Sequence, residues 1–128
     1  MWSARDRAIL EAPNFASVAT LMPDGAPHVS TIWIDVDGDD VVFNTSEGRV
    51  KTANIARDPR VSISVFDQDD PYEQVVIHGT VVDVTREGAD EHIDRMARKY
   101  LGLDAYPWRE PGERRVIVRI RPDRSSSG

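Results

Sequence analysis

The sequence of 128 residues contains no cysteine. Disulfide bonds, a thiolate nucleophile and cysteine-ligated metal sites are therefore excluded. The chain also lacks any apolar run long enough to cross a bilayer. Residues 1–7 carry charges of both signs and lead into no apolar segment, which argues against a signal peptide. From these absences we expect a cytoplasmic protein with no membrane partner.

Motifs of several common enzyme classes are missing as well. The chain has no Gly-x-Gly-x-x-Gly, no Walker loop and no Gly-x-Ser-x-Gly elbow. Its three histidines, His28, His78 and His92, are not spaced as metal ligands, so we expect no metal site. We expect His92 to be solvated on a helix and His28 to make a turn contact. A formal net charge of −6 argues against general nucleic-acid binding.

The size and composition predict one globular domain. The hydrophobic fraction of 40% is ordinary, and 128 residues suffice for a core without staples. We expect the domain to span residues 1–124. The last residues, 125–128, read Ser-Ser-Ser-Gly and are expected to form a flexible tail.

Hydrophobic periodicity and turn residues predict a mainly β fold with a few helices. Strands are expected at residues 15–22, 27–36, 41–44, 61–66, 74–84 and 115–121, and helices at 3–11, 47–57 and 86–101. Gly79 within a strand indicates a bulge or a close backbone approach. Gly102 occupies the position of a helix C-cap. Six strands joined by short turns favour an antiparallel barrel, because closure removes exposed edges.

Residues 43–51 are the most informative stretch. Residues 44–46, Asn-Thr-Ser, are typical helix N-cap residues, and Gly48 permits close approach of the backbone. Arg49 and Lys51 then place two cations beside the predicted helix start. Free N–H groups, the positive end of the helix dipole and two cations together predict an anion site, with phosphate as the expected guest.

The same charges have a simpler interpretation. Arg49, Lys51 and Arg57 can form the solvated face of an amphipathic helix that binds nothing. The charges alone leave both interpretations open. Trp33 is expected in the core, whereas Trp108, in a loop beside Tyr106, is typical of a contact surface.

A family resemblance rests on segments spread in order over nearly the whole chain. They are residues 15–21, 23–25, 27–29, 42–45, 48–51, 54–55, 57–61, 79–81, 91–94, 99–102 and 106–107. With these segments the chain resembles the pyridoxamine-phosphate-oxidase-like split-barrel proteins. The spacing Thr45-x-x-Gly48-Arg49-x-Lys51 resembles their deazaflavin-dependent branch, the class B flavin/deazaflavin oxidoreductases.

The resemblance implies a six-stranded antiparallel split β-barrel of the FMN-binding split-barrel type. It also implies a homodimer with two cofactor sites at the interface. Thr45, Arg49 and Lys51 would hold the cofactor phosphate, and residues 30–33 would lie along the ring. The full set of expected cofactor-binding residues is Ser30, Thr31, Ile32, Trp33, Asn44, Thr45, Gly48, Arg49, Val50, Lys51, Arg57, Gln74 and Trp108.

The cofactor implied by the branch is coenzyme F420, with FMN as the alternative. Its oligoglutamate tail requires further cations, which Arg57 and Arg60 would supply. Residues 115–121 contain no histidine, unlike the late Arg-x-His of true pyridoxamine phosphate oxidases, which argues against vitamin B6 oxidation. The expected activity is hydride transfer to a small conjugated acceptor such as a quinone, enone or tetrapyrrole. No catalytic side chain is identified, and a non-catalytic cofactor- or haem-binding protein remains an alternative.

Overall fold

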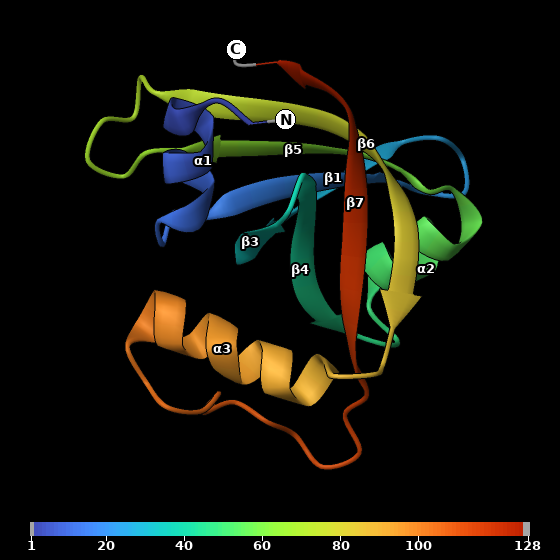
Figure 1. Ribbon diagram of the computed structural model, residues 1–128. Coiled ribbons are helices and arrows are strands. Elements are labelled where there is room, and N and C mark those ends of the chain that lie inside the picture. Colours follow the sequence, from blue (N-terminus) through green and yellow to red (C-terminus); the bar gives the residue numbers. More distant parts are fainter. Residues whose placement is uncertain (1, 127–128) are drawn as a thin grey trace.

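The computed structural model describes residues 2–126, which form a strongly curled antiparallel sheet with three helices (Figure 1). The helices are α1 (Ala4–Glu11), α2 (Val50–Arg57) and α3 (Ala89–Leu101). The strands are β1 (Ala16–Leu21), β2 (Pro27–Ile32), β3 (Ile34–Asp37), β4 (Asp40–Ser46), β5 (Arg60–Phe66), β6 (Gln74–Thr85) and β7 (Arg115–Ser126). The predicted mainly β fold is confirmed, but the described residues form seven strands rather than six.

The additional strand arises where the predicted strand 27–36 breaks. Its two halves become β2 and β3, and the sheet order is β2-β1-β5-β6-β7-β4-β3. The halves therefore lie at opposite edges of the sheet although only Trp33 separates them in sequence. The sheet has to curl until its two edges meet at Trp33, yet no described pairing joins β2 to β3. The prediction of a closed barrel with a central second strand is therefore wrong.

Strand β7 is longer than predicted and pairs with both β4 and β6. The backbones of Ser125 and Ser126 pair with β6, so the predicted tail at residues 125–128 is wrong for these two residues. Residues 127 and 128 lie outside the described residues.

The prediction for Gly79 is confirmed. The register of β6 against β7 shifts between His78 and Gly79. A Cβ atom on Gly79 would lie 2.7 Å from Ile120 Cγ2 and 2.8 Å from the Arg121 carbonyl oxygen. Only glycine fits this contact without displacement of the neighbouring strand.

The core lies inside the curled sheet. Helix α1 contacts β3, β5 and β6 at this core. Its largest fully buried side chains include Phe43, Leu10, Ile34, Ile63, Ile77 and Ile120. Helix α3 lies below β4 and β7, and the loop formed by residues 102–114 passes beneath it (Figure 1). Ile93 and Met96 of α3 are buried, and Gly102 ends this helix with a φ of 70°, as predicted.

None of the helices formed by residues 2–126 combines the length and apolarity that a bilayer crossing requires.

Candidate functional site

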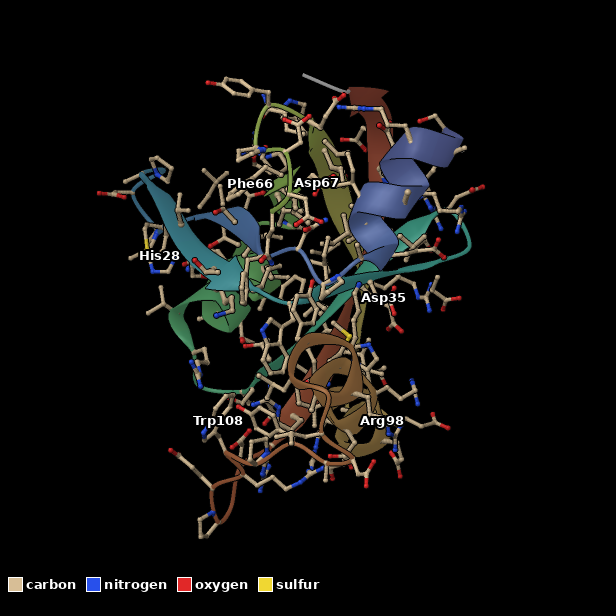
Figure 2. All side chains as sticks on the ribbon, turned by 90° about the vertical axis from the view of Figure 1, so that its left-hand side faces the viewer. His28, Asp35, Phe66, Asp67, Arg98 and Trp108 are labelled. Atoms are coloured by element: carbon tan, nitrogen blue, oxygen red, sulfur yellow. The ribbon has the colours of Figure 1, made fainter. Side chains whose placement is uncertain are left out.

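A pocket opens at the break between β2 and β3, beside the first turn of α2 and the buried face of α3. Its volume is about 170 Å³. It is lined by Thr31, Ile32, Trp33, Asn44, Thr45, Arg49, Lys51, Ile93, Met96, Tyr106, Trp108 and Arg115. Trp108 and Arg98 mark the end of the molecule formed by α3 and its loop, opposite the end that carries Phe66 and Asp67 (Figure 2). Segments far apart in sequence therefore share one space.

The helix beside the pocket begins later than predicted. Thr45 and Ser46 pair with β7, so residues 44–46 belong to β4 and do not cap a helix. The N-cap of α2 is Arg49, which makes no side-chain cap bond. The prediction of Asn-Thr-Ser as the cap is wrong because pairing with a distant strand overrides local capping preference. The N–H groups of the first turn of α2 still lack intrahelical partners, as at any helix start.

Three cations, Arg49, Lys51 and Arg115, line the pocket. Burial, followed by the charges of Arg49 and Arg115, lowers the pKa of Lys51. In the described part of the chain neither Arg49 nor Lys51 forms a salt bridge with a carboxylate. Three clustered cations, of which Arg49 and Lys51 have no described salt bridge, favour binding of an anion, which would stabilise the charged form of Lys51.

The third cation is held by its own network. Arg115 Nε donates to Asn44 Oδ1 at 2.8 Å, and the guanidinium forms a buried ion pair with Glu113. The guanidinium carbon lies 5.1 Å from the centre of the Tyr106 ring. Arg115 is therefore oriented before any ligand arrives.

His92 extends this network and is not solvated as predicted. Its side chain is buried, and Asn44 Nδ2 lies 3.1 Å from His92 Nδ1. Because the Asn44 amide donates, Nδ1 accepts and the ring is neutral. Burial, followed by the charge of Arg95, lowers the pKa of His92 to about 4. The turn contact expected of His28 is not made through its Nδ1, which is buried and has no hydrogen-bond partner among the described residues.

The rings of Trp33, Tyr106 and Trp108 form an aromatic wall on one side of the pocket. Trp33 lies 6.2 Å from Tyr106 and 6.3 Å from Trp108, measured between ring centres. Behind the wall, Tyr100 stacks on Trp33 at 5.2 Å, with 6° between the ring planes. Trp33 thus belongs to a pocket wall rather than to the main core, and Trp108 is 58% exposed.

Tyr100 is a structural residue rather than a free hydroxyl. Its Oη donates to the Asn14 carbonyl at 2.6 Å and accepts from the Ile34 N–H at 3.0 Å. Burial raises its pKa to about 12. A hydroxyl held in this way is a poor proton donor to a ligand.

The pocket brings together most of the predicted residues. They are Thr31, Ile32, Trp33, Asn44, Thr45, Arg49, Lys51 and Trp108. Ser30, Gly48, Val50, Arg57 and Gln74 do not line it in the single chain. Arg57 donates to the Leu21 carbonyl at 2.6 Å, and Gln74 pairs with Phe66 at the opposite end of the molecule. Whether any of these side chains contacts a cofactor stays a prediction.

Four residues that line the pocket, Ile93, Met96, Tyr106 and Arg115, were not among the site residues expected from the sequence. Ile93 and Met96 belong to the apolar stripe of α3, which looked like ordinary core. Tyr106 stood beside Trp108 in the loop, and that proximity was a usable signal. Arg115 carried no local signal, because only strand pairing places it beside Asn44.

A second cavity of about 600 Å³ continues past Arg49. We call it the acidic cavity, since its lining includes Glu47, Glu110 and Glu113 with Arg49 and Arg114. Arg57 and Arg60, expected to serve a polyanionic tail, line neither cavity. Arg60 instead pairs with Asp58 at 2.7 Å.

The fold and the pocket together define a class of protein: a small curled antiparallel sheet that gathers cations and aromatic rings in one pocket. The ligand suited to this arrangement is planar and carries an anionic group.

Comparison with known proteins identifies the family. The family model described as pyridoxamine 5'-phosphate oxidase matches residues 3–126, so the chain belongs to that family. A curated relative from Rubrobacter xylanophilus, pyridoxine/pyridoxamine 5'-phosphate oxidase, is 33% identical over 117 residues. That match covers 90% of this chain but 54% of the relative, so the chain spans about half the relative's length.

Solved structures agree on the fold. One named F420 reductase shares 30% identity, with a TM-score of 0.85 and 98% of both chains covered. A conserved hypothetical protein from Mycobacterium tuberculosis shares 26% identity with a TM-score of 0.75, covering 98% of this chain and 82% of that one. The names of these relatives, oxidase and reductase, both denote oxidoreductases.

Proposed function

We propose that this protein binds coenzyme F420 and is a reductase for a conjugated small-molecule acceptor such as a quinone, enone or tetrapyrrole. The observation that carries the proposal is that Arg49 and Lys51, which form no salt bridge with the described residues, share one pocket with the aromatic wall. The similarity to a structure named F420 reductase supports the deazaflavin branch. When bound in reduced form, the cofactor supplies the hydride.

The residues of this chain would bind and orient. Arg49 and Lys51 would hold the cofactor phosphate through charge-assisted hydrogen bonds, with Thr45 beside them. The rings of the aromatic wall would align the planar part. Ile93 and Met96 supply apolar surface that keeps water from the ring. No activated side chain is required for this chemistry.

A second copy of the chain is part of the proposal. The pocket volume of about 170 Å³ is below the roughly 300–1,000 Å³ of ordinary small-molecule sites. A partner that covers the open side would enlarge the contact with a tricyclic ring. We therefore propose a homodimer with the cofactor at the interface.

One observation favours FMN as a second candidate. The acidic cavity next to Arg49 carries three glutamates, and Arg57 and Arg60 are engaged elsewhere. An oligoglutamate tail entering that cavity would meet the like charges of Glu47 and Glu110 as well as the opposite charge of Arg114, whereas Glu113 is already paired with Arg115. FMN ends at its phosphate and avoids this repulsion.

A titration of the purified protein with coenzyme F420 and with FMN, followed by cofactor fluorescence, tests the proposal. Micromolar or tighter binding of the deazaflavin with weaker FMN binding supports it, and a screen of conjugated acceptors then tests turnover. The reverse preference supports the FMN candidate. Tight binding without reduction of any acceptor indicates a carrier protein, and binding of neither cofactor supports the solvated-helix interpretation.

A further inference from the structure

We propose that Asp94 of α3 is a positioning residue that holds the aromatic wall in place for the planar part of the ligand. The inference rests on the proposed function, since it concerns the same pocket. It adds a residue that does not line the pocket. It also predicts that binding of the planar ring and binding of the phosphate depend on different parts of the chain.

Asp94 binds the loop of residues 102–114 at two points. Its Oδ1 accepts from the Tyr106 backbone N–H at 2.9 Å and from Arg109 Nη2 at 2.5 Å. We call these two contacts the Asp94 latch. The Tyr106 N–H lowers the pKa of Asp94; burial opposes this effect, and the Arg109 guanidinium adds to the lowering, so that the net shift of the pKa is downward. The latch is therefore charged at neutral pH.

The loop has few other attachments. Among the described residues, hydrogen bonds from residues 104–109 to the rest of the chain come from Tyr106 and Arg109. Gly102 and Gly112 border the segment with φ values of 70° and 77°, and no helix or strand forms between them. Two of the three aromatic-wall residues, Tyr106 and Trp108, lie on this weakly attached segment.

The latch acts on the rings and not on Arg49 and Lys51, the two cations proposed to hold the phosphate. Tyr106 packs edge-on against Trp108 at 5.8 Å, so fixing the Tyr106 backbone also fixes Trp108. When the latch is lost, Arg115 keeps its bond to Asn44 on β4, and its ion pair with Glu113 lies beyond Gly112, away from the latch; only its contact with the Tyr106 ring depends on the latch. Loss of the latch should therefore weaken ring binding while phosphate binding stays unchanged.

The test compares Asp94→Ala with Asp90→Ala. Asp90 Oδ1 lies 3.5 Å from Arg109 Nη1 but does not contact the Tyr106 N–H, so it is the matched control on the same helix. With the cofactor that binds the wild type, Asp94→Ala should raise Kd by about 10-fold, the effect of one charge-assisted hydrogen bond. Inhibition of cofactor binding by inorganic phosphate should change by less than about twofold, and Asp90→Ala should resemble the wild type.

A measurement without cofactor separates this inference from the proposed function. Tryptic cleavage after Arg109 and the near-UV circular dichroism of the aromatic wall should change in Asp94→Ala and not in Asp90→Ala. Asp94→Asn, which keeps an acceptor for the Tyr106 N–H but loses the charge, should fall between them. If the wild type binds neither cofactor, the proposed function fails while these readouts still decide the latch.

Two results would overturn the inference. One is equal behaviour of Asp94→Ala and Asp90→Ala in cleavage and in cofactor affinity. The other is a parallel loss of ring and phosphate affinity in Asp94→Ala, which would mean that Asp94 supports the whole site.

Discussion

At the scale of single residues, the charges of the pocket are the features with functional content. Burial and the neighbouring cations Arg49 and Arg115 lower the pKa of Lys51. Arg115 is held in place by its hydrogen bond to Asn44 and its ion pair with Glu113. His92 is kept neutral within the same network. These groups differ in how much they support the fold, and that difference can be measured.

Lys51→Ala is expected to weaken cofactor binding by about 1.5–3 kcal/mol, because it removes a charge-assisted hydrogen bond to phosphate. The midpoint of thermal unfolding without cofactor should hardly change, since Lys51 has no described ion-pair partner. Arg60→Ala, which removes a cation away from the pocket, is the control. A loss of stability equal to the loss of affinity would show that Lys51 is structural.

His92 should make stability depend on pH. Its pKa is about 4 in the folded chain against an ordinary value of 6.5, so the unfolded state binds more protons between these values. The free energy of unfolding should therefore fall as the pH drops from about 6.5 to about 4, by at most about 3 kcal/mol. Urea unfolding across this range should show a shallower dependence in His92→Gln. Equal slopes in both proteins would contradict the prediction.

At the scale of elements, the pairing between strands explains the observed element boundaries better than the secondary-structure propensity of each segment does. Strand β7 pairs with β4 along its first half and with β6 along most of its length, and the β6 bulge at Gly79 allows that contact. Because β4 pairs with β7 as far as Ser46, residues 44–46 are extended and α2 begins only at Val50. The first turn of α2 therefore lies beside the pocket.

Gly79→Ala should lower the free energy of unfolding by about 1–3 kcal/mol, since the added Cβ would overlap Ile120 and the Arg121 carbonyl. Chemical denaturation at constant pH measures this change. Ser64→Ala, at an exposed position on β5, is the control and should be close to neutral. An unchanged denaturation midpoint for Gly79→Ala would mean that β7 shifts to accommodate the added Cβ with no loss in the free energy of unfolding.

At the scale of the whole molecule, the curled sheet brings its two edges together at Trp33, and the pocket forms at that place. The pocket is open, and large apolar side chains remain exposed elsewhere on the chain, including Val29 at 62% and Phe66 at 46%. Both features are consistent with coverage by a further chain.

We predict that the protein sediments as a dimer at micromolar concentration. Sedimentation velocity with and without cofactor measures this, and the cofactor should strengthen the association if its site lies at the interface. Ser64→Ala again serves as a folded reference. A monomer in both conditions would contradict the proposed interface site.

The features that could be predicted from the sequence are those set by residues close together in the chain. The helix at Ala4–Glu11, the strand containing Gly79 and the C-cap at Gly102 depend on near neighbours, and the sequence predicted them. The break at Trp33 was missed because apolar residues on both faces of residues 27–36 resemble a central strand. Burial of His92 was missed because it depends on which side of α3 meets β4.

Residue types and their local order are enough to establish the mainly β class, the absence of cysteine chemistry, and the cations and aromatic residues from which a site is built. Periodicity, turn residues and composition do not depend on contacts between residues far apart in the chain. Tertiary structure decided that β2 and β3 part at Trp33 and that Arg115 meets Asn44. It also decided that Asp94 holds the loop carrying Tyr106. These contacts join residues far apart in the chain, so only the packed sheet and its helices could bring them together.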